Sequence, residues 1–165
     1  MNIFKVNRKF NLGDLIISLL ITVGGGFIVG LFIKPYVPIY KTLNKLFFFP
    51  PGYVFPIVWT ILYILMAIAF YRILQISKLG KKTYSSLTLF YIQLIFNFLW
   101  SFIFFNFRLY GIAFIEAVIL LILVFITTKK FFKVDKIAGW LMVPYVFWLT
   151  YASVLSYFVW ILNEM

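Results

Sequence analysis

Five long apolar runs, separated by short segments that hold most of the lysines and arginines, make up most of this 165-residue chain. The runs cover approximately residues 12–33, 53–76, 84–107, 109–128 and 137–162. An α-helix needs roughly 20 residues to cross the hydrocarbon core of a bilayer, and each run comes close to or exceeds that length. The pattern therefore predicts an all-α integral membrane protein, a five-transmembrane-helix bundle that forms a single domain over residues 1–165.

The composition agrees with a chain that is folded within a lipid bilayer. Hydrophobic residues make up 65% of it and charged residues 12%, against about 45–50% and about 25% in soluble domains. Cysteine and histidine are both absent, which excludes disulfides, thiolate nucleophiles, histidine bases and Cys/His metal sites. The first run is too long for a signal-peptide core and has no small-residue cleavage site after it, so we expect it to remain as a helix.

The net charge of +11 is spread between the runs instead of forming a patch, so we expect no nucleic-acid partner. Eleven basic residues, including Lys5, Arg8 and Lys9 of the N-terminal arm, belong to the arm and to the second and fourth connections. Only four belong to the first and third connections. The positive-inside rule then places the N-terminus in the cytoplasm and the C-terminus outside, in what we expect to be a bacterial cell membrane.

The first connection, residues 34–52, is long for a loop between two helices and rich in aromatic residues, including Tyr40 and the triplet at residues 47–49. We call it the long loop. Its aromatic residues fit either an anchor in the interfacial belt of the membrane or a lid over a pocket. In the first run, Gly26 and Gly30 have the spacing that lets helices approach closely, within the bundle or in a dimer.

Large rings and polar groups recur at helical spacing in the later runs. Phe55, Trp59 and Tyr63 follow one another at i, i+4 and i+8 and share one face of the second helix. Such aromatic stripes serve packing more often than ligand binding. Gln93, Asn97 and Ser101 form a polar stripe on the third helix, where polar groups join helices more often than they meet a ligand.

Glu116 is the only acidic residue well inside a run. A charged acid there costs about 2.5–3.5 kcal/mol, so we expect its carboxyl to face the bundle interior, either paired or protonated. On the fifth helix, Tyr145, Trp148 and Ala152 lie on one side, and Pro144 predicts a kink.

Helix rise places several of these side chains at similar depths. Measured from the side of the long loop, Trp59 lies about 9 Å deep, Glu116 about 10 Å, Asn97 about 15 Å and Trp148 about 21 Å. All four therefore lie in one half of the bilayer or near its middle, beneath the long loop, which suggests a pocket between the helices.

The motifs of the chain resemble those of the TspO/MBR family, the tryptophan-rich sensory proteins and translocator proteins once called peripheral benzodiazepine receptors. Residues 50–63, PPGYVFPIVWTILY, resemble the central family motif, in which Trp often stands at the position of Tyr53. Residues 144–148, PYVFW, and 151–157, YASVLSY, resemble the fifth helix, and Asn97 with Trp100 resembles the third. Glu116 stands where the family often has aspartate.

This resemblance implies a five-helix bundle, commonly a homodimer, that binds porphyrins and flat drug-like molecules between its helices. Family residues that match Trp59, Asn97 and Trp148 line the pocket, and the loop position of Tyr40 closes over it. Leu46 and Phe48 depart from the family pattern, so the resemblance does not fix the shape of the lid, and the cholesterol motif is incomplete after Tyr157. The candidate ligand-binding residues are Trp59, Asn97, Trp148, Tyr40, Tyr63, Phe55, Trp100, Tyr145, Ala152 and Glu116.

Three function classes follow from the residues together with this resemblance, which is what implies porphyrin binding in the first and porphyrin degradation in the second. The first is a membrane receptor, sensor or transporter for porphyrins, with protoporphyrin IX or haem as ligand and no required cofactor. The second is a light-dependent enzyme that degrades porphyrin, with Trp59 and Trp148 supplying electrons. The third is a structural or ion-conducting bundle, for which Glu116 is the only support.

Overall fold

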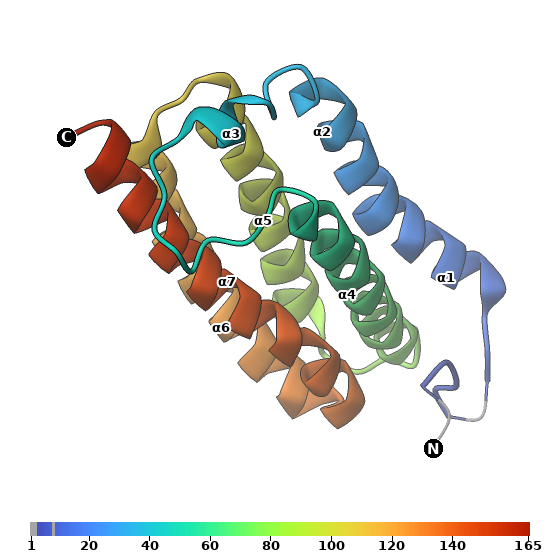
Figure 1. Cartoon of the computed structure of the whole chain (residues 1–165). Coiled ribbons are helices and arrows are strands. Elements are labelled where there is room, and N and C mark those ends of the chain that lie inside the picture. Colours follow the sequence, from blue (N-terminus) through green and yellow to red (C-terminus); the bar gives the residue numbers. More distant parts are fainter. Residues whose placement is uncertain (1–2, 8) are drawn as a thin grey trace.

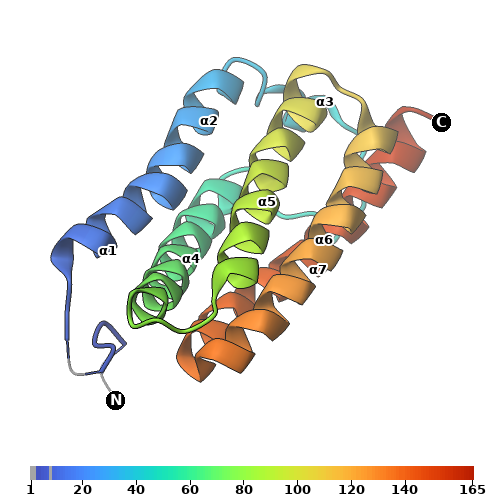
Figure 2. The same cartoon turned by 180° about the vertical axis from the view of Figure 1, so that it is seen from behind.

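The computed structural model describes residues 3–7 and 9–165, and its regular elements are helices that run side by side (Figures 1 and 2). Arg8 of the basic N-terminal arm lies outside the described residues. The elements are α1 (Leu12–Leu19), the π-helical turn η1 (Leu20–Gly24), α2 (Gly25–Ile33), α3 (Ile39–Thr42), α4 (Val54–Lys78), α5 (Tyr84–Ser101), the π-helical turn η2 (Phe102–Asn106), α6 (Tyr110–Val134) and α7 (Lys136–Asn163). They form five spans long and apolar enough to cross a membrane, which confirms the predicted fold class.

Four of the five predicted helices agree with the structure to within two residues at each end, but the fourth was predicted to end too early. The helix α6 continues to Val134 instead of ending near residue 128. Its two threonines interrupt the apolar pattern, yet Thr127 and Thr128 donate to the carbonyls of Leu123 and Val124, so the helix itself satisfies their hydroxyls. Lys133 lies in the last turn, where a positive charge favours the helix dipole.

The helix α4 lies in the middle of the bundle, with the first span on one side and α7 on the other (Figure 1). Seen from behind, α5 lies between the first span and α6 (Figure 2). A Cβ atom at Gly26 would lie 2.4 Å from the Tyr63 ring, so this glycine lets the first span approach α4, whereas Gly30 faces open space. The long loop and the C-terminus share one end of the bundle, and the N-terminal arm lies at the other (Figures 1 and 2).

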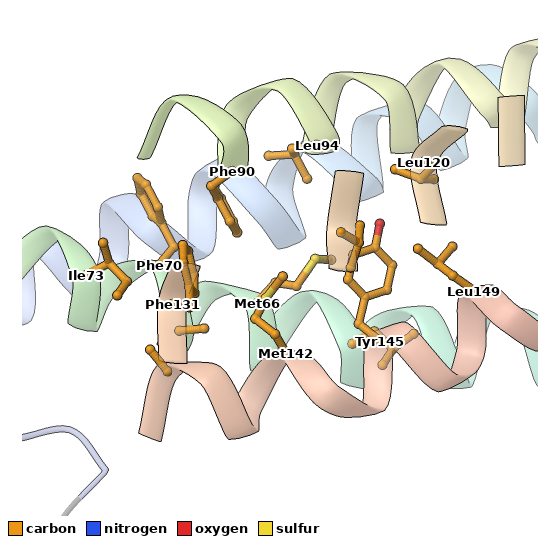
Figure 3. Packing of buried hydrophobic residues seen from close by; sticks show 14 residues of the cluster. Met66, Phe70, Ile73, Phe90, Leu94, Leu120, Phe131, Met142, Tyr145 and Leu149 are labelled. Carbon is orange, nitrogen blue, oxygen red and sulfur yellow. The ribbon is translucent and has the colours of Figure 1, made fainter. Parts of the chain in front are cut away.

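The half of the bundle away from the long loop is filled by stacked rings and methionines (Figure 3). Phe70 stacks on Phe90 with ring centroids 4.6 Å apart, and Phe90 stacks on Phe131 at 5.9 Å. Met66 and Met142 pack in the same cluster and are fully buried. Interiors packed in this way leave few voids larger than a water molecule, so this half of the bundle offers no room for a ligand.

A buried arginine ties the N-terminal arm to the bundle. The guanidinium of Arg72 pairs with the carboxylate of Asp135, with Nε and Oδ2 2.5 Å apart and Nη2 and Oδ1 3.2 Å apart. Its Nη1 donates to the carbonyls of Ile3 at 2.7 Å and Lys5 at 3.2 Å. Asp135 also accepts from the backbone N–H of Ala138 and so caps α7. One side chain therefore connects α4, the α6–α7 junction and the arm.

Candidate functional site

Five aromatic side chains of α4 and α7 meet in the half of the bundle nearer the long loop. We call them the aromatic cluster: Phe55, Trp59, Tyr63, Tyr145 and Trp148. Trp59 is at its centre, stacked on Tyr63 with centroids 5.5 Å apart and edge-on to Tyr145 at 6.1 Å. Its ring is nearly perpendicular to that of Trp148, at 6.5 Å and 87°. The stripe predicted on the second helix thus lies against the residues predicted on the fifth.

Hydrogen bonds connect the deep end of the aromatic cluster to α5. The hydroxyl of Tyr63 donates to Oδ1 of Asn97 at 2.6 Å, and Nδ2 of Asn97 donates to the hydroxyl of Tyr145 at 2.7 Å. Asn97 and Tyr145 are buried. Three helices are therefore held together by one asparagine, which fits the helix-joining role that polar groups usually have in membranes.

The long loop folds over this end of the bundle. Tyr40 is buried, packs edge-on against Phe55 with centroids 5.2 Å apart, and donates from its hydroxyl to the carbonyl of Pro50 at 2.8 Å. Burial, with a smaller contribution from nearby Tyr151, raises the pKa of Tyr40 to about 12, so its hydroxyl remains a donor at neutral pH. Lys45 donates to the carbonyl of Tyr40 and lies over its ring.

Two further contacts hold the long loop to α7. Asn44 accepts from and donates to Asn163, with its backbone N–H 2.8 Å from Oδ1 and its carbonyl 3.1 Å from Nδ2. The hydroxyl of Tyr151 donates to the carbonyl of Phe48 at 2.8 Å, and the Phe48 ring packs against Phe158. Hydrogen bonds at Asn44 and at Phe48 thus hold the long loop to α7, which suits the interpretation of this loop as a lid.

The space beneath the long loop is nearly closed. A void of about 20 Å³ remains there, which is room for about one water molecule. Of the candidate residues, Tyr40, Phe55, Trp100 and Ala152 line it, whereas Trp59, Tyr63, Asn97, Glu116, Tyr145 and Trp148 do not. The sequence led us to expect one pocket lined by all ten residues. The rings of the aromatic cluster instead occupy the deeper part of that space.

A larger groove opens on the side of the bundle, between α4 and α7. It has a volume of about 430 Å³, and its walls are almost entirely apolar. The residues that line it are Val58, Ile61, Leu62, Pro144, Phe147, Trp148 and Tyr151. Trp148 therefore contacts both the interior aromatic cluster and this side groove, which sequence reasoning did not anticipate because helix rotation decides it.

Three of the residues singled out in the sequence differ in their contacts: Trp100 is bonded within the protein, whereas Glu116 and Gln93 have no hydrogen-bond partner among the described residues. Trp100 donates from Nε1 to the carbonyl of Ala113 at 3.1 Å and stacks on Phe104 at 4.8 Å. Glu116 is buried, as expected, but is not paired: its carboxyl has no hydrogen-bond partner among the described residues. Gln93, which the sequence assigned to helix contacts, is fully buried and also lacks a partner within the described part of the chain.

The spans and the site together define a multi-pass membrane protein with an aromatic site beneath a closing loop. Residues 18–161 match the TspO/MBR family over most of the chain. The chain therefore belongs to the TspO/MBR family, and the resemblance seen in its motifs is confirmed. Family and fold together support a membrane sensor or receptor.

The chain is similar to named members from bacteria and animals. It is 36% identical over 124 residues to Protein CrtK of Rhodobacter capsulatus, which covers 75% of this chain and 78% of the relative. It is 37% identical over 118 residues to the tryptophan-rich sensory protein of Cereibacter sphaeroides, covering 72% of each. Over 122 residues it is 31% identical to the human translocator protein, covering 73% of this chain and 72% of the relative.

Proposed function

We propose that this protein is a membrane receptor that binds porphyrins, such as protoporphyrin IX or haem, and other flat ligands at the aromatic cluster beneath the long loop. The observation that carries the proposal is the perpendicular pair of Trp59 and Trp148, 6.5 Å apart, at the junction of the aromatic cluster and the side groove. A flat π-system can stack on one of these rings and meet the edge of the other. The N–H of Trp148 has no partner among the described residues and is free to donate to a ligand.

Binding beneath the long loop requires the loop to move. The void there has room for about one water molecule, whereas pockets for drug-sized ligands measure about 300–1,000 Å³. The bonds from Asn163 and Tyr151 to the long loop are few, and the Asn163 bond is exposed whereas the Tyr151 bond is partly buried. Lys34, Lys41 and Lys45 of the loop would then be near the carboxylates of a bound porphyrin, a favourable arrangement of charges.

The packing favours sensing over passage through the bundle. The stacked rings of Phe70, Phe90 and Phe131 fill the half away from the long loop, and Arg72 holds the N-terminal arm across that end. A ligand that enters beneath the long loop would meet this packed core. The same packing argues against an ion-conducting path that includes Glu116.

A second candidate is light-dependent degradation of a bound porphyrin. Its support is the continuous contact of Trp148, Trp59 and Tyr63, with successive centroids 6.5 and 5.5 Å apart. These oxidisable rings could supply electrons to a photoexcited ligand. Illumination of the purified protein with protoporphyrin IX separates the two candidates, because a new absorbing product that depends on Trp59 favours the enzyme.

The direct test of the proposed function is titration of the purified protein with protoporphyrin IX in the dark, followed by quenching of tryptophan emission. We expect saturable binding, and a linear, unsaturable response would reject the proposal. The expected homodimer, which rests on the family resemblance, is tested by light scattering of the protein in detergent. Monomers at every protein concentration would reject it.

A further inference from the structure

One end of the bundle carries a large excess of positive charge. The N-terminal arm, the α4–α5 connection and the α6–α7 junction share this end (Figures 1 and 2), and with the adjoining helix turns they hold eleven of the fifteen lysines and arginines. The acidic residues near them already have cationic partners, since Asp14 pairs with Lys78 and Asp135 with Arg72. The other basic side chains described at this end therefore have no carboxylate to neutralise them, and their field attracts an external anion.

Two lysines of this end lie on the tight turn between α4 and α5. Gly80 has a φ angle of 81°, in the left-handed region that glycine favours, and its N–H donates to the carbonyl of Ser77 at 2.9 Å. This geometry ends α4 and lets α5 begin at Tyr84. Lys81 and Lys82 are both exposed, so the turn presents two ammonium groups beside the start of α5.

The last turns of α6 bring a third lysine to the same place. Nζ of Lys130 donates to Oγ of Ser85, in the first turn of α5. The two helices lie side by side and run in opposite directions, so the end of α6 lies near the start of α5 (Figure 2). The Ser85 hydroxyl accepts a bond from the ammonium group but leaves its charge in place. We call Lys81, Lys82, Ser85 and Lys130 the lysine cluster.

The start of α5 itself favours an anion. Thr83 occupies the N-cap position but makes no capping bond, and its buried hydroxyl has no partner among the described residues. The bonds of the helix begin with the N–H groups of Ser86 and Leu87, which donate to the carbonyl of Thr83. The N–H groups of Tyr84 and Ser85 therefore have no capping side chain. Such N–H groups, together with the positive end of the helix dipole, commonly bind phosphate.

The lysine cluster lies at the edge of the apolar spans, where a lipid headgroup would be. It falls between the end of the span Val54–Lys78 and the start of the span Tyr84–Asn106. Leu79 is 48% exposed and Tyr84 is 83% exposed, and tyrosine is enriched at the interface between membrane and water. These neighbours suit a lipid, whose acyl chains would cover them, better than a soluble anion or a nucleic acid.

We propose that the lysine cluster and the start of α5 bind the phosphate headgroup of an anionic membrane phospholipid, such as phosphatidylglycerol. The ammonium groups pair with the phosphate oxygens, and the N–H groups at the start of α5 donate to them. The bound headgroup would also hold the α4–α5 turn to the end of α6. This inference does not depend on porphyrin binding, because the lysine cluster lies at the end of the bundle away from the long loop (Figure 1).

The test is titration of the purified protein in detergent with phosphatidylglycerol or phosphatidylcholine, with bound lipid measured by native mass spectrometry. Each lysine near the surface contributes about fivefold to the affinity for an anionic lipid. We therefore expect the wild type to bind phosphatidylglycerol more tightly than phosphatidylcholine by about tenfold or more. The double variant Lys82→Gln, Lys130→Gln should bind phosphatidylglycerol roughly 25-fold more weakly and phosphatidylcholine as before. Arginine at both positions keeps the charges and should keep the preference.

The matched control removes the same charge at the other end of the bundle. Lys34 and Lys41 are exposed, and the double variant Lys34→Gln, Lys41→Gln should bind phosphatidylglycerol as the wild type does. Equal losses in the two glutamine variants would show that overall charge, and not the lysine cluster, attracts the lipid, and would overturn the inference. Equal affinities of the wild type for the two lipids would also overturn it. Displacement of phosphatidylglycerol by an equal concentration of inorganic phosphate would assign the site to a soluble anion and reject the lipid.

Discussion

The hydroxyl of Tyr63 on α4 donates to Asn97 on α5 at 2.6 Å, and this bond fixes the aromatic cluster relative to the polar side of the core. The amide of Asn97 in turn donates a hydrogen bond to the hydroxyl of Tyr145 on α7. The ring of Trp59 contacts both tyrosines. The orientation of the central tryptophan therefore depends on a polar group that lies outside the aromatic cluster.

Tyr63→Phe and Asn97→Leu should destabilise the bundle to different degrees. Tyr63→Phe removes one hydrogen bond, at a cost of about 0.5–1.5 kcal/mol, whereas Asn97→Leu leaves the hydroxyls of buried Tyr145 and partly buried Tyr63 without a partner, at about 1–3 kcal/mol. Thermal unfolding in detergent measures both. Thr60→Val is the control, because the Thr60 hydroxyl is exposed and bonds only within its own helix. Equal melting temperatures for all three variants would contradict this role of Asn97.

The two ion pairs of the described residues should differ strongly in their contribution to stability. Arg72→Met leaves Asp135 largely buried without its partner, and breaking a buried pair in this way costs about 3–5 kcal/mol. Lys78→Met removes a lysine whose side chain is 54% exposed, and its buried partner Asp14 keeps the hydrogen bond from Gln75, so we expect a smaller loss than for Arg72→Met. Melting temperatures of the two variants, measured side by side, test this difference. A similar decrease for both would show that Arg72 does not secure the bundle end.

Release of the long loop should increase its local opening without unfolding the helices. Asn163→Ala removes the side chain that both accepts from and donates to the Asn44 backbone. Hydrogen exchange of residues 43–49 should then become faster, because fewer contacts oppose local opening. Thr42→Ala is the matched control, since the Thr42 hydroxyl bonds within the loop itself. Unchanged exchange in Asn163→Ala would mean that other contacts hold the loop, such as the bond from Tyr151 to the Phe48 carbonyl and the aromatic packing.

We predict that the N-terminus is cytoplasmic and the C-terminus lies outside, because basic residues are concentrated on the N-terminal side. The natural chain contains no cysteine, so a single introduced cysteine reports without background. In intact cells an impermeant thiol reagent should label Glu164→Cys and leave Lys81→Cys unlabelled. The reverse pattern would overturn the orientation.

The sequence was sufficient to predict the spans, because a long apolar run within a bilayer must satisfy its own backbone hydrogen bonds and therefore forms a helix. It could not predict contacts between residues distant in the chain. The pair of Arg72 and Asp135 joins residues 63 positions apart, and nothing in either local pattern indicates the other. The last turns of α6 were missed because Thr127, Thr128 and the lysines after them look like the end of an apolar span. In the helix, the two threonine hydroxyls bond to backbone carbonyls, and Lys133 lies in the last turn, where its charge is favourable.

The sequence predicted the residue types of the candidate site but only part of their arrangement in space. Depth along each helix correctly grouped Trp59 with Trp148, since helix rise is nearly constant. Rotation about each helix axis is set by packing, so the sequence could not tell that Trp148 also faces a side groove. It also assigned Gln93 to helix contacts, because only the folded core reveals that this amide has no partner among the described residues.

The affinity of the purified protein for protoporphyrin IX, compared among wild type, Trp59→Ala and Trp160→Phe, tests the central proposal most directly. Loss of the Trp59 ring removes stacking worth about 0.5–1.5 kcal/mol and the apolar area it buries, together roughly 3 kcal/mol or about a hundredfold in affinity. Trp160 stacks on Phe114 at 5.8 Å and does not belong to the aromatic cluster, so Trp160→Phe should bind as the wild type does. Equal dissociation constants for all three proteins would contradict the proposed site.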